Sequence, residues 1–256
     1  MLIGACISHI GAIRTNNEDN CCFGGFYLPE THESMDRAFD AILPNHSIAG
    51  VFDGLGGEWF GEVASFMAAR AFSSEAIYSA GDLTRLFGDV NAQIVNEALV
   101  RKAPIMGTTC AMVAAADDGL LFGNVGDSQI LMLRDGEASS LAYMDTNRKL
   151  LDSMGLYEAT PSITQYLGMH DNAGVLQPHI CQLKPNNGDQ FLLSSDGLTN
   201  EVELGEIIEV LRDPNASITE KTEKLCSMAL KRGGHDNVTV VLCEAVENNE
   251  CNIYGN

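Results

Sequence analysis

The sequence predicts an α+β fold, because its strands follow one another in antiparallel order and its long amphipathic helices come in pairs. Short apolar runs bounded by turn residues predict strands at 2–10, 21–27, 47–52, 108–116, 120–125, 130–133, 179–183, 190–194 and 238–244. Apolar residues that recur every three or four positions predict helices at 58–73, 82–101, 202–212 and 217–232. The first two helices are each expected to cover one face of a sheet.

Turn and capping residues mark the boundaries of these elements. Asp117-Asp118-Gly119 and Asp135-Gly136 predict turns of an antiparallel meander that contains all three strands between residues 108 and 133. Asp82 is expected to cap the N-terminus of the helix at 82–101. Ser217-Ile218-Thr219-Glu220 has the pattern of a capping box at the start of the last helix.

Two segments lack a regular period. Residues 28–46 are interpreted as a polar excursion without evident chemistry. Residues 144–177 contain only a short helical stretch at 147–154. An irregular segment of this length inside a compact domain is typical of a lid or a binding loop.

The composition favours one soluble domain. Of the 256 residues 45% are apolar, which is enough for a full core and too much for a disordered chain. No low-complexity linker divides the chain, so we expect a single domain over 1–246 and a polar tail over 247–256. No apolar run reaches the length of a membrane helix, and the N-terminal apolar stretch lacks a basic start. A cytoplasmic protein without a membrane partner is therefore expected.

Net charge and cysteine content indicate which partners and which kinds of cysteine chemistry to expect. The formal net charge of −20 would repel phosphate backbones, so nucleic acid is not an expected partner. The eight cysteines include no Cys-x-x-Cys pair and lie mostly in apolar strands or helices. They are expected to be buried reduced thiols, with a zinc site or a set of disulfides as the alternative.

Several acidic residues stand where apolar strands end. Asp53 follows the strand at 47–52 and precedes a glycine-rich turn, and Asp196 repeats this arrangement after 190–194. A carboxylate at a rigid strand end is a suitable ligand for a hard cation, although Asp-Gly after a strand also occurs in ordinary turns. The other acids of this character are Glu18, Asp127 and Asp236.

These acids would repel one another strongly if the fold brought them together, so the cluster would require cations. Mg²⁺ or Mn²⁺ is the expected occupant, because the candidate ligands are oxygens and no histidine or cysteine set has ligand spacing. Two such ions would activate a bridging water and neutralise a phosphoryl oxygen, as in metal-assisted phosphoester hydrolysis. Arg14 would supply a planar fork for the remaining phosphate oxygens, with a solvated loop as the alternative for the turn at 14–20.

Short motifs that contain these residues occur in a fixed order along the whole chain. They are Arg14-x-x-x-Glu18-Asp19, Asp53-Gly54-x-Gly56-Gly57, Gly107-Thr108-Thr109, Gly126-Asp127-Ser128, Ser195-Asp196-Gly197 and Gly234-His235-Asp236-Asn237. Each motif alone is common, but the ordered set is specific. It resembles the metal-dependent protein phosphatases of type 2C, which act on serine and threonine, and especially their compact bacterial members.

The resemblance implies which residues bind the ions. In that family the residue that matches Asp53 bridges two Mn²⁺ or Mg²⁺ ions, and the matches of Asp196 and Asp236 complete one site. The matches of Glu18 and of the Gly54 carbonyl serve the other site, partly through water.

The resemblance also implies roles around the ions. Asp19 would orient metal-bound water, Arg14 would grip the substrate phosphate, and Asp127 would help to hold a weaker third ion. Residues 144–177 correspond to the mobile flap of the family. The implied fold is a four-layer αββα sandwich of two antiparallel β-sheets flanked by helix pairs, which agrees with the four predicted helices.

The sequence departs from the family pattern at several positions. Leu55 stands where some members have a histidine that protonates the leaving group, and leucine cannot donate a proton. Asn200 stands where an acidic ligand of the third ion is common, so that ion is expected to bind more weakly. Gln129 replaces a frequent arginine without a functional explanation. His235 is interpreted as an ordinary loop histidine.

We therefore predict a protein serine/threonine phosphatase in which a metal-bridged hydroxide attacks phosphorus in line. The expected substrates are phosphorylated cytoplasmic proteins, including a partner kinase. Two alternatives remain open: a catalytically silent pseudophosphatase that acts as a signalling or docking module, and a two-metal phosphodiesterase or small-molecule phosphatase. Retention of the principal carboxylates and of Arg14 argues against the first alternative.

Overall fold

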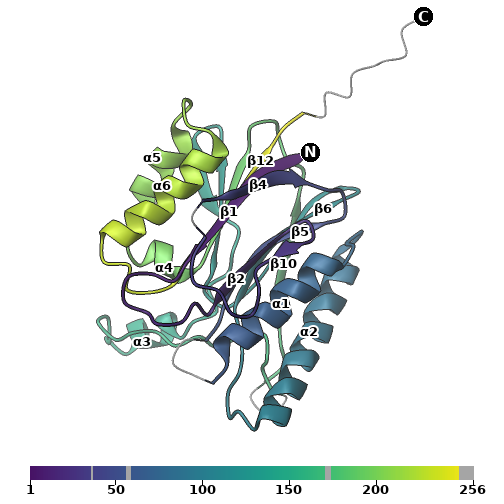
Figure 1. Ribbon diagram of the computed structural model, residues 1–256, viewed down its shortest axis with the longest axis vertical. Helices are drawn as coiled ribbons and strands as arrows, with labels where there is room; N and C mark the ends of the chain where they lie inside the picture. The colour runs from purple at the N-terminus through teal and green to yellow at the C-terminus, as the bar shows by residue number, and fades with distance from the viewer. Residues whose placement is uncertain (36, 56–58, 171–173, 248–256) are drawn as a thin grey trace, which may run out of the picture.

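The computed structural model describes residues 1–35, 37–55, 59–170 and 174–247. Within these residues the strands form two six-stranded antiparallel sheets (Figure 1). One sheet has the order β4 (Phe39–Leu43), β1 (Leu2–His9), β12 (Val238–Ala245), β11 (Gln190–Ser194), β8 (Gln129–Arg134) and β9 (Glu137–Ser140). The other has the order β10 (His179–Leu183), β7 (Gly119–Val125), β6 (Cys110–Ala116), β5 (Ile48–Asp53), β2 (Asp19–Phe23) and β3 (Phe26–Tyr27).

A pair of helices covers the outer face of each sheet. Helices α1 (Gly61–Ser74) and α2 (Ala80–Arg101) lie on the sheet that contains β5, and α5 (Leu204–Arg212) and α6 (Ile218–Lys231) lie on the sheet that contains β1 (Figure 1). The short helices are α3 (Arg148–Ser153) and α4 (Asp196–Thr199). None of the described helices combines the length and apolar character that crossing a bilayer requires. The predicted fold class, a four-layer αββα sandwich, is confirmed.

Alternating side chains along the central strands build the layers of the core. In β6, Cys110 and Met112 pack toward α1 and α2, whereas Ala111 and Val113 belong to the core between the sheets. Because both faces of such a strand are covered, its sequence is apolar throughout instead of alternating. Burial of each large apolar side chain contributes about 1.5–3 kcal/mol. This packing holds the ends of the strands, where the acids stand, in fixed relative positions.

The prediction that the strands between residues 108 and 133 belong to one antiparallel meander, interrupted at 126–128, was wrong. β6 and β7 pair as expected, but β8 pairs with β9 and β11 in the opposite sheet. The chain crosses between the sheets at Gly126, which has a φ of 97° and leaves no room for a side chain, since a Cβ there would lie 2.7 Å from Thr109 Cγ2. Apolar patterning predicts a buried strand but does not say which of two covered sheets the strand joins.

Several shorter elements also differ from the prediction. The strand predicted at 21–27 is a hairpin of β2 and β3, because Gly24 and Gly25 both adopt positive φ between them. The excursion at 28–46 contains β4, which pairs with β1 at the edge of its sheet. β9 and α4 were also not predicted.

Helix caps were predicted with mixed success. Ser79, not Asp82, is the N-cap of α2; its side chain accepts from the Asp82 N–H, and the Asp82 carboxylate returns the bond to the Ser79 backbone. By sequence, Asp82 could be the N-cap itself or the third residue of a capping box. The structure shows that it is the third residue. The capping box of Ser217 and Glu220 at α6 is confirmed.

Parts of some predicted segments lie outside the described residues. This holds for Gly56 and Gly57 of the glycine-rich turn, for the predicted helix start at Glu58 and for most of the predicted tail, of which Glu247 is described. The described part of the first helix begins at Gly61.

Candidate active site

The acidic residues that stand near strand ends line one cavity of about 560 Å³. β5 ends at Asp53, α4 begins at Asp196 directly after β11, and Asp236 precedes β12. Arg14 reaches the same cavity from the loop that follows β1. The described acidic residues that line it are Glu18, Asp53, Asp127, Asp196 and Asp236. Five acids with a single arginine give this cavity a strongly negative potential.

The backbone around Asp53 is fixed by two threonines. The Thr109 hydroxyl accepts a hydrogen bond from the Asp53 N–H at 3.1 Å, and the Thr108 hydroxyl donates to the Asp53 carbonyl at 2.9 Å. The Thr109 hydroxyl also bonds to Ser128, next to Asp127, at 2.7 Å. Asp53 and Asp127 are therefore held by one buried network, although they come from different strands.

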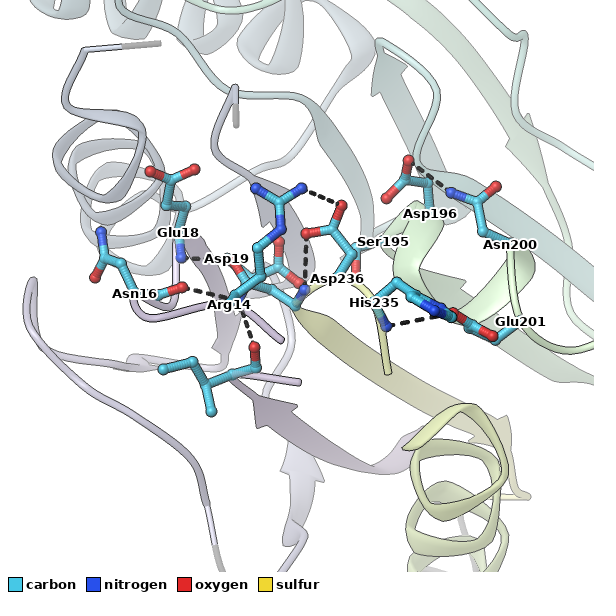
Figure 2. Close-up of polar contacts among 12 residues, drawn as sticks. Arg14, Asn16, Glu18, Asp19, Ser195, Asp196, Asn200, Glu201, His235 and Asp236 are labelled. Atoms are coloured by element: carbon cyan, nitrogen blue, oxygen red, sulfur yellow. Dashed lines mark hydrogen bonds and ion pairs between the residues drawn. The ribbon is translucent and has the colours of Figure 1, made fainter. Parts of the chain in front are cut away.

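Arg14 and its loop lie directly beside Asp236. Arg14 Nη2 donates to Asp236 Oδ2 at 2.7 Å, and both side chains are about one third exposed, at 38% and 34% (Figure 2). The side chain of Asn237 ties the loop in place, because its Nδ2 donates to the carbonyls of Ile10 at 2.8 Å and Asn16 at 3.0 Å. Its Oδ1 accepts from the Glu18 N–H at 2.8 Å.

Burial and mutual repulsion raise the pKa of several of these carboxyls. Burial, followed by the charges of Asp19 and Asp196, raises the pKa of Asp53 well above its ordinary value. Burial and then Asp196 raise the pKa of Asp127 to about 6. Burial also raises the pKa of Glu18. The protein alone thus leaves the ionised forms of these acids poorly compensated.

Asp19 lies behind this cluster. It is 1% exposed, and burial raises its pKa to about 7. The Ser195 hydroxyl donates to Asp19 Oδ2 at 2.8 Å and accepts from the Thr239 N–H at 3.0 Å. Asp19 is also the register partner of Asp53 between β2 and β5, so the two carboxylates belong to neighbouring strands.

The donor set fits a hard divalent cation. All of the acidic donors are carboxylate oxygens, which hard divalent cations prefer. The raised pKa values of Glu18, Asp53, Asp127 and Asp196 indicate that added positive charge would stabilise their ionised forms. Two of them are bound by neighbours: Asp236 by Arg14, and Asp196 by Asn200 Nδ2 at 3.0 Å. In the described part of the chain, no three His, Cys, Asp or Glu side chains form a closed set around one point. Shared ions and additional ligands, such as water and the Gly54 carbonyl, suit this open arrangement.

The irregular segment at 144–177 forms one wall of the cavity. Pro161, Ser162, Ile163 and Tyr166 line it, and the segment is anchored where Leu167 and Thr108 exchange backbone hydrogen bonds at 2.9 and 3.0 Å. A second cavity of about 430 Å³, lined by residues of the same segment, shares Asp127 and Asp196 with the first.

The residues that depart from the family pattern are distributed between the two cavities. Leu55 lines the first cavity, and Asn200 and Gln129 line the second. His235 lines neither of them; its Nδ1 lies 2.6 Å from Glu201 Oε1 and its side chain is 71% exposed. In Figure 2 the His235 ring lies beside Glu201, on the side away from Arg14.

Three residues that position the site have no predicted role of their own. Asn237, Ser195 and Thr109 belong to the sequence motifs only as neighbours of the acids. The signal that could have singled them out is that polar side chains stand next to the strand-end acids within otherwise apolar strands.

The fold and the cavity together define a metal-dependent phosphatase architecture, and sequence comparison identifies the family. A family profile described as protein phosphatase 2C matches residues 34–242. The chain therefore belongs to the protein phosphatase 2C family. The matched range begins after Arg14, Glu18 and Asp19, so the family profile does not include those residues.

Individual relatives are bacterial phosphatases. The chain is 30% identical over 248 residues to the serine/threonine protein phosphatase PstP of Mycobacterium tuberculosis, which covers 93% of this chain and 44% of PstP. It thus spans less than half of the length of that relative. It is 29% identical over 252 residues to protein phosphatase PhpP of Streptococcus pneumoniae, covering 92% of this chain and 94% of PhpP.

Solved structures show the same fold. PppA of Pseudomonas aeruginosa, described as a regulatory component of its T6SS, superposes with a TM-score of 0.76 at 25% identity, over 95% of this chain and 97% of PppA. The catalytic domain of PstP in complex with two manganese ions superposes with a TM-score of 0.74 at 28% identity, over 96% of this chain and 100% of that domain.

Proposed function

We propose that this chain is a metal-dependent protein phosphatase that hydrolyses phosphoserine and phosphothreonine monoesters. The observation that carries the proposal is the single cavity lined by five acids and Arg14, in a chain that belongs to the protein phosphatase 2C family. The related PstP domain holds two manganese ions, which agrees with the oxygen donors of this cavity.

The residues that would hold the ions are the acids of the cavity. Asp53 would be shared by two ions, with Asp196 and Asp236 at one and Glu18 and the Gly54 carbonyl at the other. Asp127 would contribute to a weaker third ion beside Asn200. Bound Mn²⁺ or Mg²⁺ supplies activation of water and neutralisation of the phosphoryl oxygens.

Arg14 is proposed to bind the substrate phosphate. Its guanidinium lies at the cavity, and one of its N–H groups donates to Asp236. A guanidinium has further N–H donors in the same plane, which suits the oxygens of a phosphate. Leu55 cannot give a proton to the leaving serine or threonine oxygen, so water must supply that proton.

The acid behind the cluster is proposed to orient water. Asp19 reaches the cluster from β2 and is held by the Ser195 hydroxyl. A buried carboxylate in this position can accept a hydrogen bond from water and so fix its direction of attack.

Phosphorylated proteins are the proposed substrates, and a cognate serine/threonine kinase is a proposed partner. The relatives PstP and PhpP are named protein phosphatases. Among the described cysteines seven are free thiols and six of these are buried, which supports a reducing compartment such as the cytoplasm. Residues 1–246 are proposed to form one catalytic domain, with 144–177 as a flap beside the site.

The test is turnover of p-nitrophenyl phosphate and of a phosphothreonine peptide, with EDTA and then with added Mn²⁺. We expect hydrolysis only with the metal. We expect Asp53→Ala and Asp196→Ala each to abolish hydrolysis and to weaken Mn²⁺ binding measured by calorimetry. Absence of metal-dependent turnover in the wild-type protein would favour a docking module. Preference for bis(p-nitrophenyl) phosphate over the peptide would favour a phosphodiesterase.

A further inference from the structure

A buried acid outside the set above joins the flap to the Asp127 turn. Asp145 is 5% exposed, and its Oδ2 accepts a hydrogen bond from the Gly126 N–H at 3.1 Å. The Asp145 N–H donates to the Gly126 carbonyl at 2.9 Å, and the Thr164 N–H donates to the Asp145 carbonyl at 2.7 Å. Asp145 therefore contacts the turn on one side and the flap segment at Thr164 on the other.

His179 holds the other oxygen of this carboxylate. His179 Nε2 lies 3.0 Å from Asp145 Oδ1, and its ring packs at a tilt of 30° against Tyr143 with centroids 4.4 Å apart. Asn124 is the register partner of His179 across β7 and β10. The Asn124 side chain donates to the Tyr143 carbonyl at 2.6 Å and accepts from the Tyr143 N–H at 3.0 Å. The sheet thus holds Asp145 through His179 and holds Tyr143 through Asn124.

The turn that Asp145 holds is the one that presents Asp127 to both cavities. Gly126 has a φ of 97°, and a Cβ there would lie 2.7 Å from Thr109 Cγ2, so the turn is packed closely against Thr109. The flap residues Pro161 to Ile163 line the same cavity, three positions or fewer from Thr164. Loss of the Asp145 contacts would therefore move two walls of the cavity relative to each other.

We propose that Asp145, held by His179, is a positioning residue that fixes the Asp127 turn against the base of the flap. This inference rests on the proposed phosphatase function for its effect on rate. Asp145 does not line either cavity, so it acts through Gly126 and Thr164 and not on the substrate. Small displacements of catalytic groups cost about tenfold or more in rate, which sets the expected size of the effect.

The experiment compares Asp145→Ala with Asp145→Asn in the full chain. Asparagine keeps an oxygen for the Gly126 N–H and places an amide that can donate to one tautomer of His179, whereas alanine removes both contacts. For Asp145→Ala we expect kcat on p-nitrophenyl phosphate and on a phosphothreonine peptide to fall about tenfold. We expect Asp145→Asn to stay within about threefold of wild type. Equal defects in both variants would overturn the proposal, because charge and not position would then matter.

Amide hydrogen exchange provides a readout that does not depend on turnover. In Asp145→Ala the Gly126 amide should lose protection, because its acceptor is the removed side chain, and in Asp145→Asn it should keep it. Wild-type protection and wild-type kcat in Asp145→Ala would overturn the proposal. If the wild-type protein lacked turnover, the proposed function would fail, and the exchange of the Gly126 amide would still decide whether Asp145 holds the turn.

The chain offers a matched control for the histidine. His46 also lies beside an aspartate, with Nε2 3.4 Å from Asp117 Oδ1, and packs at a tilt of 30° against Tyr78 with centroids 4.2 Å apart. Neither residue of this pair lines the two cavities. His179→Ala should lower kcat about threefold while His46→Ala leaves it unchanged. Equal kcat values in the two variants would overturn the proposal even if Asp145→Ala did not fold.

Discussion

The side-chain oxygen of Asn237 accepts a hydrogen bond from the backbone N–H of Glu18 at 2.8 Å, across 219 positions of the sequence. The same side chain donates to the carbonyls of Ile10 and Asn16, so it ties the loop that carries Arg14 to the segment that carries Asp236 just before β12. Asn237 is 5% exposed, and buried bonds of this kind cannot be replaced by water without rearrangement.

Asn237→Ala should therefore damage both stability and metal binding. Loss of three hydrogen bonds should lower the free energy of unfolding by about 3 kcal/mol. Release of the loop should also weaken Mn²⁺ binding, because Glu18 would no longer be fixed. Urea unfolding and calorimetry with Mn²⁺ measure the two effects.

Asn91 is the matched control for this prediction. Its side chain also makes three backbone hydrogen bonds, to Met169 O, Gly168 N and Met169 N, but on helix α2. Asn91→Ala should cost similar stability and leave Mn²⁺ affinity unchanged. Equal loss of Mn²⁺ affinity in both variants would show that general destabilisation, and not the loop, weakens the site.

Arg14→Ala should act mainly on substrate binding. Loss of a charge-assisted contact to phosphate should raise KM by about one to two orders of magnitude. The free energy of unfolding should change by less than about 1 kcal/mol, because the ion pair with Asp236 is partly exposed. Steady-state kinetics on a phosphothreonine peptide measure the effect.

Arg101→Ala is the control for Arg14→Ala. Arg101 pairs with Glu97 at 2.7 Å with similar exposure of both side chains, 32% and 31%. Its removal should leave KM unchanged. A fall in kcat without a change of KM in Arg14→Ala would mean that the arginine does not bind the substrate in its ground state.

The stability of the metal-free protein should depend on pH through protonation of the Asp127 carboxyl. Its pKa rises from 3.8 in the unfolded chain to about 6 in the folded protein, so the folded state binds more protons between these values. Its contribution to stability is therefore full below about pH 4 and is lost as the pH rises through 6, by up to about 3 kcal/mol. His9 and His32 act in the opposite sense, because burial lowers their pKa.

The difference between wild type and Asp127→Asn isolates this dependence. With EDTA present, wild type should lose stability relative to Asp127→Asn between about pH 4 and about pH 7, by about 2–3 kcal/mol. Urea unfolding at several pH values measures it. A wild-type curve parallel to that of the variant would show that Asp127 is not perturbed by burial and by Asp196.

Asn200→Asp should strengthen the weaker metal site and destabilise the protein without metal. The amide now donates to Asp196, and a carboxylate would repel it instead. We expect a loss of about 1–2 kcal/mol in unfolding free energy with EDTA. We expect about tenfold tighter binding of the weakest Mn²⁺ ion. Asn200→Ala removes the same bond without adding charge, so Mn²⁺ affinity no higher in Asn200→Asp than in Asn200→Ala would contradict the prediction.

Much of the fold could be predicted because its signals are local. The long helices α2 and α6 have apolar stripes and capping residues within a few positions, and the central strands are apolar throughout. The sequence could not predict that β8 joins the sheet that contains β11 and not the sheet that contains β7, because an apolar strand can be buried in either sheet. Gly126 supplies the crossing, but a glycine before an aspartate is equally typical of a tight turn.

The sequence by itself determined which chemical groups the chain offers: acids after apolar strands, Arg14 in a polar turn, and no charge suited to nucleic acid. Those properties belong to residue types and their near neighbours. The tertiary structure alone decided that Asp53, Asp127 and Asp236 line one cavity, that Asn237 secures Glu18, and that Asp145 contacts Gly126. The physical reason is that these contacts join segments far apart in the chain, and packing of the two sheets, not local preference, sets their distances.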